Sequence, residues 1–119
     1  MKDNVVKIKS FAFAVRIVKL YQYLCEHKKE FILSKQLMRS GTSVGAMVRE
    51  AEHAETKNDF KHKMGIAQKE INETIYWLEL LKETGYLTQE QFISINNDAI
   101  EIIKLITAIL KTTKSSINN

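Results

Sequence analysis

The chain has 119 residues, no proline and four glycines, and it carries 18 Lys and Arg against 14 Asp and Glu. This length suits one domain with a single core, so we treat residues 1–119 as one unit. No apolar run is long enough to span a bilayer, and the first ten residues lack the features of a secretory signal peptide. From these two absences we expect a cytoplasmic protein with no membrane contact. The long proline-free stretches predict an all-α fold.

The first predicted helix covers residues 4–28 and has two apolar faces. One face carries Phe11, Ala14, Val18, Tyr21 and Cys25, and a nearly opposite face carries Val6, Phe13, Leu20 and Leu24. A monomeric bundle buries only one face of a helix well. We therefore expect a homo-oligomer in which the second face packs on a neighbouring subunit, the alternative being a face covered by the bundle's own loops.

The second predicted helix covers residues 34–55, with the Ser34 hydroxyl as its N-terminal cap. Its core stripe contains Leu37, Val44, Val48 and Ala51, with Ser40 and Gly41 beside them. Gly41 and Gly45 then lie inside the helix, where each costs about 1 kcal/mol relative to Ala. A phosphate-binding loop is disfavoured because no strand precedes the glycines and the lysine of that motif is missing. We expect the glycines to let another helix come close.

The third and fourth predicted helices cover residues 58–84 and 88–115. Thr56 or Asn58 caps the former, Gly85 follows its end, and Thr88 with Gln91 forms a capping box for the latter. Their core stripes are Phe60, Met64, Ala67, Ile71, Thr74 and Leu78, and Phe92, Ile95, Ala99, Ile102, Ile103, Ile106 and Leu110. Short connections between four long helices predict an antiparallel up-down-up-down bundle.

Charge is distributed unevenly along the chain. Residues 1–69 contain 14 Lys and Arg against 7 Asp and Glu, whereas residues 70–119 contain 4 against 7, giving net charges of +7 and −3. A basic first half favours contact with a nucleic acid or another polyanion. The alternative is that these cations lie on ordinary solvated helix faces. The candidate nucleic-acid contacts are Lys9, Arg16, Lys19, Lys57, Lys61 and Lys63.

A polar ridge runs along the second helix and consists of Gln36, Arg39, Ser43 and Glu50. Folding the second and third helices back at residue 56 places Arg39 level with Glu73 and one turn from Glu70. We expect Arg39 to pair with a carboxylate there, which fixes the register of the two helices.

Catalytic and metal chemistry are poorly supported by the sequence. Glu50 and His53 have the spacing by which bundle helices supply ligands to a di-metal centre, but no other histidine follows a glutamate in this way. The serines and Cys25 have no histidine that helical geometry brings close. We therefore expect no catalytic residue, no metal and no other cofactor.

Two segments resemble a known family. "SKQLMRSGTSVGAMVREAE" and "IAQKEINETIYWLELL" resemble the second and third helices of bacterial four-helix bundle proteins associated with intervening sequences in 23S ribosomal RNA, also called S23 ribosomal proteins. The matching positions are Gln36, Leu37, Arg39, Ser43, Val44, Glu50, Ile66, Ala67, Glu73 and Leu78. Met47 replaces the usual Asn, Ala51 the usual Gly, and Lys69-Glu70 the usual Gly-Ser, which puts in doubt any site to which those family residues contribute.

The resemblance implies a four-helix bundle that assembles as a cyclic pentamer. A more distant similarity, to the accessory protein of diversity-generating retroelements, implies a basic pentameric bundle that binds a reverse transcriptase and nucleic acid. The first functional hypothesis is a non-enzymatic oligomeric scaffold that binds RNA or another nucleic acid. The second is a protein–protein adaptor without nucleic-acid contact.

Overall fold

The computed structural model describes residues 2–118 and the side chains of residues 5–113. It contains four α-helices: α1 (Lys2–His27), α2 (Leu33–Glu52), α3 (Lys57–Glu83) and α4 (Gln89–Asn118). The expected all-α, four-helix fold is confirmed, and the helix ends differ from the predicted ends by one to three residues. Within the described residues, no helix combines the length and apolarity needed to cross a membrane.

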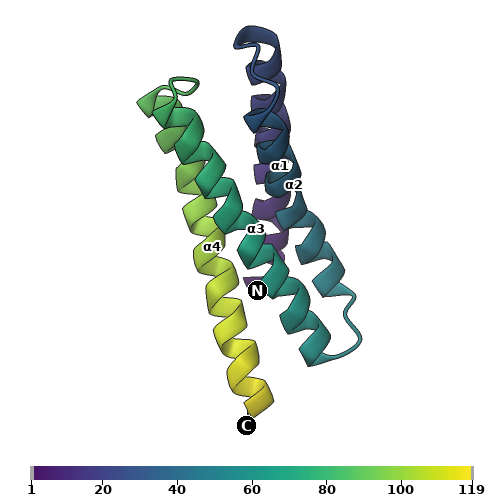
Figure 1. The fold of residues 1–119 in the computed structure, drawn as a ribbon. Helices are drawn as coiled ribbons and strands as arrows, with labels where there is room; N and C mark the ends of the chain where they lie inside the picture. The colour runs from purple at the N-terminus through teal and green to yellow at the C-terminus, as the bar shows by residue number, and fades with distance from the viewer. Residues whose placement is uncertain (1, 119) are drawn as a thin grey trace.

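The helices form a long bundle of about 51 × 21 × 20 Å in which each packs against two neighbours (Figure 1). Contacts between neighbouring helices show opposite chain directions. Lys7 near the start of α1 meets Glu52 at the end of α2, while Cys25 near the end of α1 lies beside Ser34 at the start of α2. The α1–α2 and α3–α4 turns share one end of the bundle (Figure 1).

Three predicted helix ends have the expected local chemistry. The Asp59 N–H donates to the Thr56 hydroxyl oxygen, which caps α3. Thr88 and Gln91 form a reciprocal capping box at the start of α4. The Thr88 N–H donates to Gln91 Oε1 and the Gln91 N–H donates to Thr88 Oγ1, with nitrogen–oxygen distances of 2.9 and 3.1 Å. At the end of α3, Gly85 has a φ of 86°, a conformation that glycine adopts without steric cost.

The cap of α2 differs from the prediction. Ser34 lies inside the helix, and its hydroxyl donates to the Glu30 carbonyl oxygen at 2.7 Å. The cap is the buried Glu30 carboxylate, which accepts hydrogen bonds from the N–H groups of Ile32, Leu33 and Ser34 at 3.1, 3.0 and 2.7 Å. Burial raises the pKa of Glu30, but these backbone bonds outweigh it and hold the pKa below its ordinary value.

The orientation of α1 corrects the prediction about its two faces. Val6, Phe13 and Leu24, from the face expected to meet a neighbouring subunit, lie in the core together with Ile17. From the other face, Phe11 is 55% exposed. The side of α1 that faces away from the core carries large apolar residues: Val5, Ile8, Phe11 and Val15.

The two mid-helix glycines of α2 allow α1 to approach closely. A Cβ atom added at Gly41 would lie 2.8 Å from Ile17 Cγ1, and one added at Gly45 would lie 3.3 Å from the Ser10 carbonyl oxygen. The steric role predicted for these glycines is therefore confirmed.

The core stripes of the other three helices match the prediction closely. On α2, Leu37, Ser40, Gly41, Val44, Val48 and Ala51 are all buried. On α3 the buried stripe runs from Met64 to Leu81, and on α4 from Ile95 to Ile109, with Phe60, Phe92, Ile103 and Leu110 packed against it at the edges.

Alanine at Gly41 tests the close approach of α1. We expect Gly41→Ala to lower the free energy of unfolding by about 1 to 2 kcal/mol, because the added methyl group meets the buried, β-branched Ile17. Gly65→Ala is the matched control: an added Cβ there meets nothing within 4 Å, and we expect a gain of up to about 1 kcal/mol. Urea denaturation measures both; equal gains for the two variants would contradict close packing at Gly41.

Glu30→Gln tests the carboxylate cap. At neutral pH we expect the variant to lose about 1 kcal/mol of unfolding free energy, because a neutral amide accepts the three backbone bonds less well. The folded-state pKa of Glu30 is depressed, so this stabilisation is fully present above the ordinary carboxyl pKa and is lost as pH falls through the depressed value. Denaturation at neutral and acidic pH should show the two proteins converging in acid. A difference independent of pH would exclude the proposed cap.

Candidate nucleic-acid interface

Two of the three candidate cations on α1 are bound to carboxylates of α4. Arg16 Nη1 lies 2.6 Å from Asp98 Oδ2, and Arg16 Nη2 donates to the Ser94 hydroxyl at 2.9 Å. Lys9 Nζ lies 3.1 Å from Glu101 Oε2. These cations hold α1 against α4, and their charge is largely compensated within the bundle.

Arg16 and the exposed Lys19 line a groove of about 490 Å³ between α1 and α4. The floor of the groove is apolar, and Glu90 also lines it. A carboxylate in the same groove repels an approaching polyanion. This groove is therefore a weak candidate for a nucleic-acid site.

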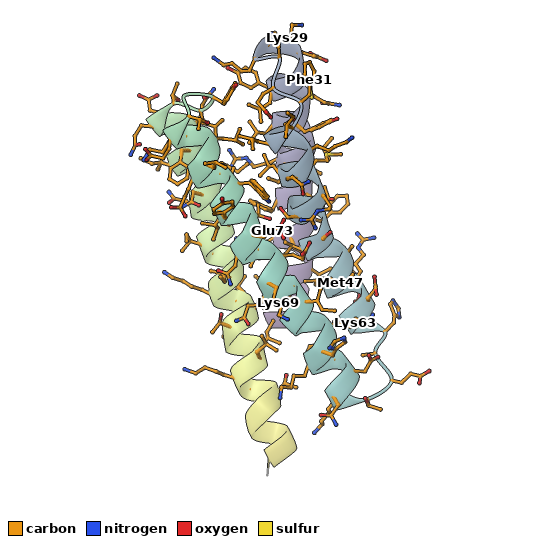
Figure 2. The ribbon with its side chains drawn as sticks, in the orientation of Figure 1. Lys29, Phe31, Met47, Lys63, Lys69 and Glu73 are labelled. Carbon is orange, nitrogen blue, oxygen red and sulfur yellow. The ribbon has the colours of Figure 1, made fainter. Side chains whose placement is uncertain are left out.

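The candidates at the start of α3 point in different directions. Lys63 Nζ donates to Glu50 Oε1 of α2 at 2.9 Å, and this hydrogen bond, reinforced by the charge of Glu50, raises the pKa of Lys63. Lys57 and Lys61 are exposed. Figure 2 shows Lys63 beside α2 and Lys69 farther from it, so Lys63 belongs to the α2–α3 contact. The six sequence candidates thus do not form one surface.

A different basic surface lies on the outer side of α3. Lys57, Lys61, Gly65 and Lys69 follow one another at intervals of four residues and form a stripe along the helix. Around Gly65 there is a shallow depression of about 410 Å³, lined by Asn58, Lys61, His62, Gly65, Ile66, Gln68 and Lys69. None of these seven residues is acidic. Because Gly65 has no side chain, a ligand can approach the helix backbone there.

The basic stripe continues onto α4. The Gln68 side-chain amide donates to the Thr107 hydroxyl at 3.1 Å, which joins the depression to α4. Lys104 and Lys111 are exposed and lie about one turn on either side of Thr107. We call the exposed lysines Lys61, Lys69, Lys104 and Lys111 the basic face.

Of the basic face, only Lys61 was among the candidates predicted from the sequence. Lys69, Lys104 and Lys111 were not predicted. Counting charge by halves of the chain placed Lys104 and Lys111 in an acidic segment, although their helix brings them beside α3. The four-residue spacing of Lys61, Gly65 and Lys69 was the available signal for the stripe.

The polar ridge joins α2 to α3, as expected. Arg39 forms ion pairs with Glu73 and with Glu70, the latter at 3.2 Å. The Gln36 amide oxygen accepts from Arg39 Nε at 3.3 Å, and the Ser43 hydroxyl donates to the Arg39 carbonyl oxygen at 2.7 Å. Glu50, the last member of the ridge, binds Lys63 and not Arg39. Within the described part of the chain, no three His, Cys, Asp or Glu side chains gather as metal ligands would.

Comparison with known proteins establishes the family. The family model described as "23S rRNA-intervening sequence protein" matches residues 2–108. The chain belongs to the 23S rRNA-intervening sequence protein family. A crystal structure from Bacteroides thetaiotaomicron, described as a protein of unknown function from the S23 ribosomal protein family, is 61% identical, with a TM-score of 0.93 over 93% of this chain and 99% of that chain. No curated protein matches the chain.

The family resemblance gave three departures: Met47, Ala51 and the Lys69-Glu70 pair. Ala51 lies in the buried core stripe of α2, and Glu70 lies at the α2–α3 contact. Met47 is partly buried and packs against the core, and Glu70 is one of the two carboxylates bound to Arg39. Lys69 is exposed in the basic face (Figure 2). In this member of the 23S rRNA-intervening sequence protein family, Met47 therefore packs against the core, and Glu70 binds α3 to α2 through Arg39.

Replacing Arg39 tests the α2–α3 lock. Arg39→Met leaves Glu70 and Glu73 side by side without their cation, and we expect it to lower the free energy of unfolding by about 1 kcal/mol. Adding Glu73→Leu removes one of the two repelling charges, so the double variant should be more stable than Arg39→Met alone. Thermal or urea denaturation of four proteins, namely the native protein, Arg39→Met, Glu73→Leu and the double variant, measures this coupling. Strictly additive losses would contradict it.

Proposed function

We propose that this protein is a non-enzymatic, homo-oligomeric scaffold that works in the cytoplasm and binds RNA or another nucleic acid through the basic face. The observation that carries the proposal is the set of exposed lysines around a depression with no acidic lining residue. Lysines placed at regular intervals along a helix neutralise successive phosphates, and the release of counterions drives such binding. Membership of a family named for an rRNA intervening sequence favours RNA among the polyanions.

The outward face of α1 supports the homo-oligomer. Ile8 is 68% exposed and Phe11 is 55% exposed, and Val5 and Val15 extend the same apolar surface over about 15 Å of helix. Exposed apolar patches of this kind are typical of contacts between protein chains. A second copy of the chain, in the five-subunit ring expected from the family resemblance, is the proposed occupant.

The protein–protein adaptor remains the second candidate function. The α1–α4 groove favours it, because an apolar floor formed by Leu20, Tyr23, Leu87 and Ile95 with polar sides suits a peptide better than a polyanion.

An RNA titration at several salt concentrations tests the main proposal. We compare Lys69→Gln/Lys104→Gln with Lys9→Gln/Arg16→Gln, a control that removes the same number of positive charges from the α1–α4 ion pairs. With a single-stranded RNA, the first variant should bind about tenfold more weakly. The slope of log K against log salt should fall by about 1.4, because two phosphate contacts of about 0.7 each are lost.

The control variant should keep a slope close to that of the native protein, and circular dichroism should show that both variants are folded. Absence of RNA binding by the native protein at low salt would contradict the proposal and favour the adaptor. An unchanged slope for Lys69→Gln/Lys104→Gln would exclude the basic face as the binding surface.

A further inference from the structure

Tyr76 is an exposed aromatic residue on the same helix as the basic stripe. Tyr76 is 57% exposed, and it lies seven residues after Lys69. Seven residues are almost two helical turns, so Tyr76 and Lys69 share a side of α3 about 10 Å apart along its axis. The stripe of lysines therefore leads to an exposed aromatic ring.

The ring of Tyr76 is braced from one side. Trp77 packs against it edge-on, with ring centroids 5.0 Å apart and an interplanar angle of 71°. The Trp77 indole N–H donates to Glu73 Oε2 at 2.9 Å, and Glu73 also binds Arg39 of α2. The polar ridge thus holds Trp77, and Trp77 limits the movement of Tyr76, which lowers the entropy cost of stacking a ligand on the tyrosine.

A surface with lysines and one exposed aromatic ring favours single-stranded nucleic acid over a duplex. Bases inside a duplex are already stacked on each other, whereas an unpaired base has a free face that stacks on tyrosine. Beyond Tyr76, α3 carries the exposed carboxylates of Glu79 and Glu83, which repel phosphates. A bound strand is therefore favoured on the part of α3 from Lys61 to Tyr76.

We propose that α3 binds a single-stranded segment of nucleic acid, with phosphates over Lys61 and Lys69 and one unpaired base stacked on Tyr76. This inference rests on the proposed nucleic-acid binding and adds the class of ligand and the residue that selects it. The lysines supply most of the affinity, and Tyr76 supplies the preference for an unpaired base.

The test measures fluorescence anisotropy of two labelled RNAs at low salt, a short oligoadenylate and a blunt-ended, fully paired RNA duplex with the same total number of phosphates. The native protein should bind the oligoadenylate more tightly. Tyr76→Ala should weaken oligoadenylate binding about tenfold while leaving duplex binding unchanged, because only the oligoadenylate loses a stacked base. Tyr76→Phe should keep native affinity, and Lys69→Gln should weaken binding of both RNAs.

Phe31→Ala is the matched control, since Phe31 is also 57% exposed but lies at the α1–α2 turn (Figure 2). It should bind both RNAs as the native protein does. Native affinity of Tyr76→Ala for the oligoadenylate, or tighter binding of the duplex by the native protein, would overturn this inference while leaving nucleic-acid binding in place. Failure of the native protein to bind either RNA would overturn the proposed function as well.

Discussion

The close approach of α1 to α2 at Gly41 and Gly45 determines how the rest of the surface is arranged. Ile17 occupies the space that a side chain at position 41 would fill, so α1 has one rotational setting against α2. That setting buries Val6 and Phe13 and turns Ile8 outward. The apolar outer face of α1 is therefore a direct consequence of two glycines in the neighbouring helix.

The same setting decides which cations are available to a ligand. It points Lys9 and Arg16 towards α4, where Glu101 and Asp98 bind them, and so removes them from any strongly basic surface. The basic surface that remains lies on α3 and α4, around a depression that Gly65 leaves open. Net charge by sequence segment is a poor guide in such a bundle, because ion pairs such as Lys9–Glu101 and Arg16–Asp98 join residues from distant parts of the chain.

The sequence predicted those features that depend on neighbouring residues or on a regular register. The Thr88–Gln91 capping box and the Thr56 cap involve contacts within one turn, and the pairing of Arg39 with Glu73 follows from where the chain reverses. The buried side of α1 was not predictable, because both of its faces are apolar and the choice depends on contact with Gly41. The Glu30 cap was missed because a turn residue, and not the first polar residue of the helix, supplies the carboxylate.

The outward face of α1 is proposed to form an interface between copies of the chain, and the mass of the protein in solution is the direct test of that interface. Size-exclusion chromatography with light scattering should give the native protein a multiple of 13.8 kDa and Ile8→Glu the mass of one chain. Ile93→Glu, which places the same charge at an exposed apolar residue of α4, should keep the native mass. A native protein of 13.8 kDa would contradict the proposed interface between copies of the chain.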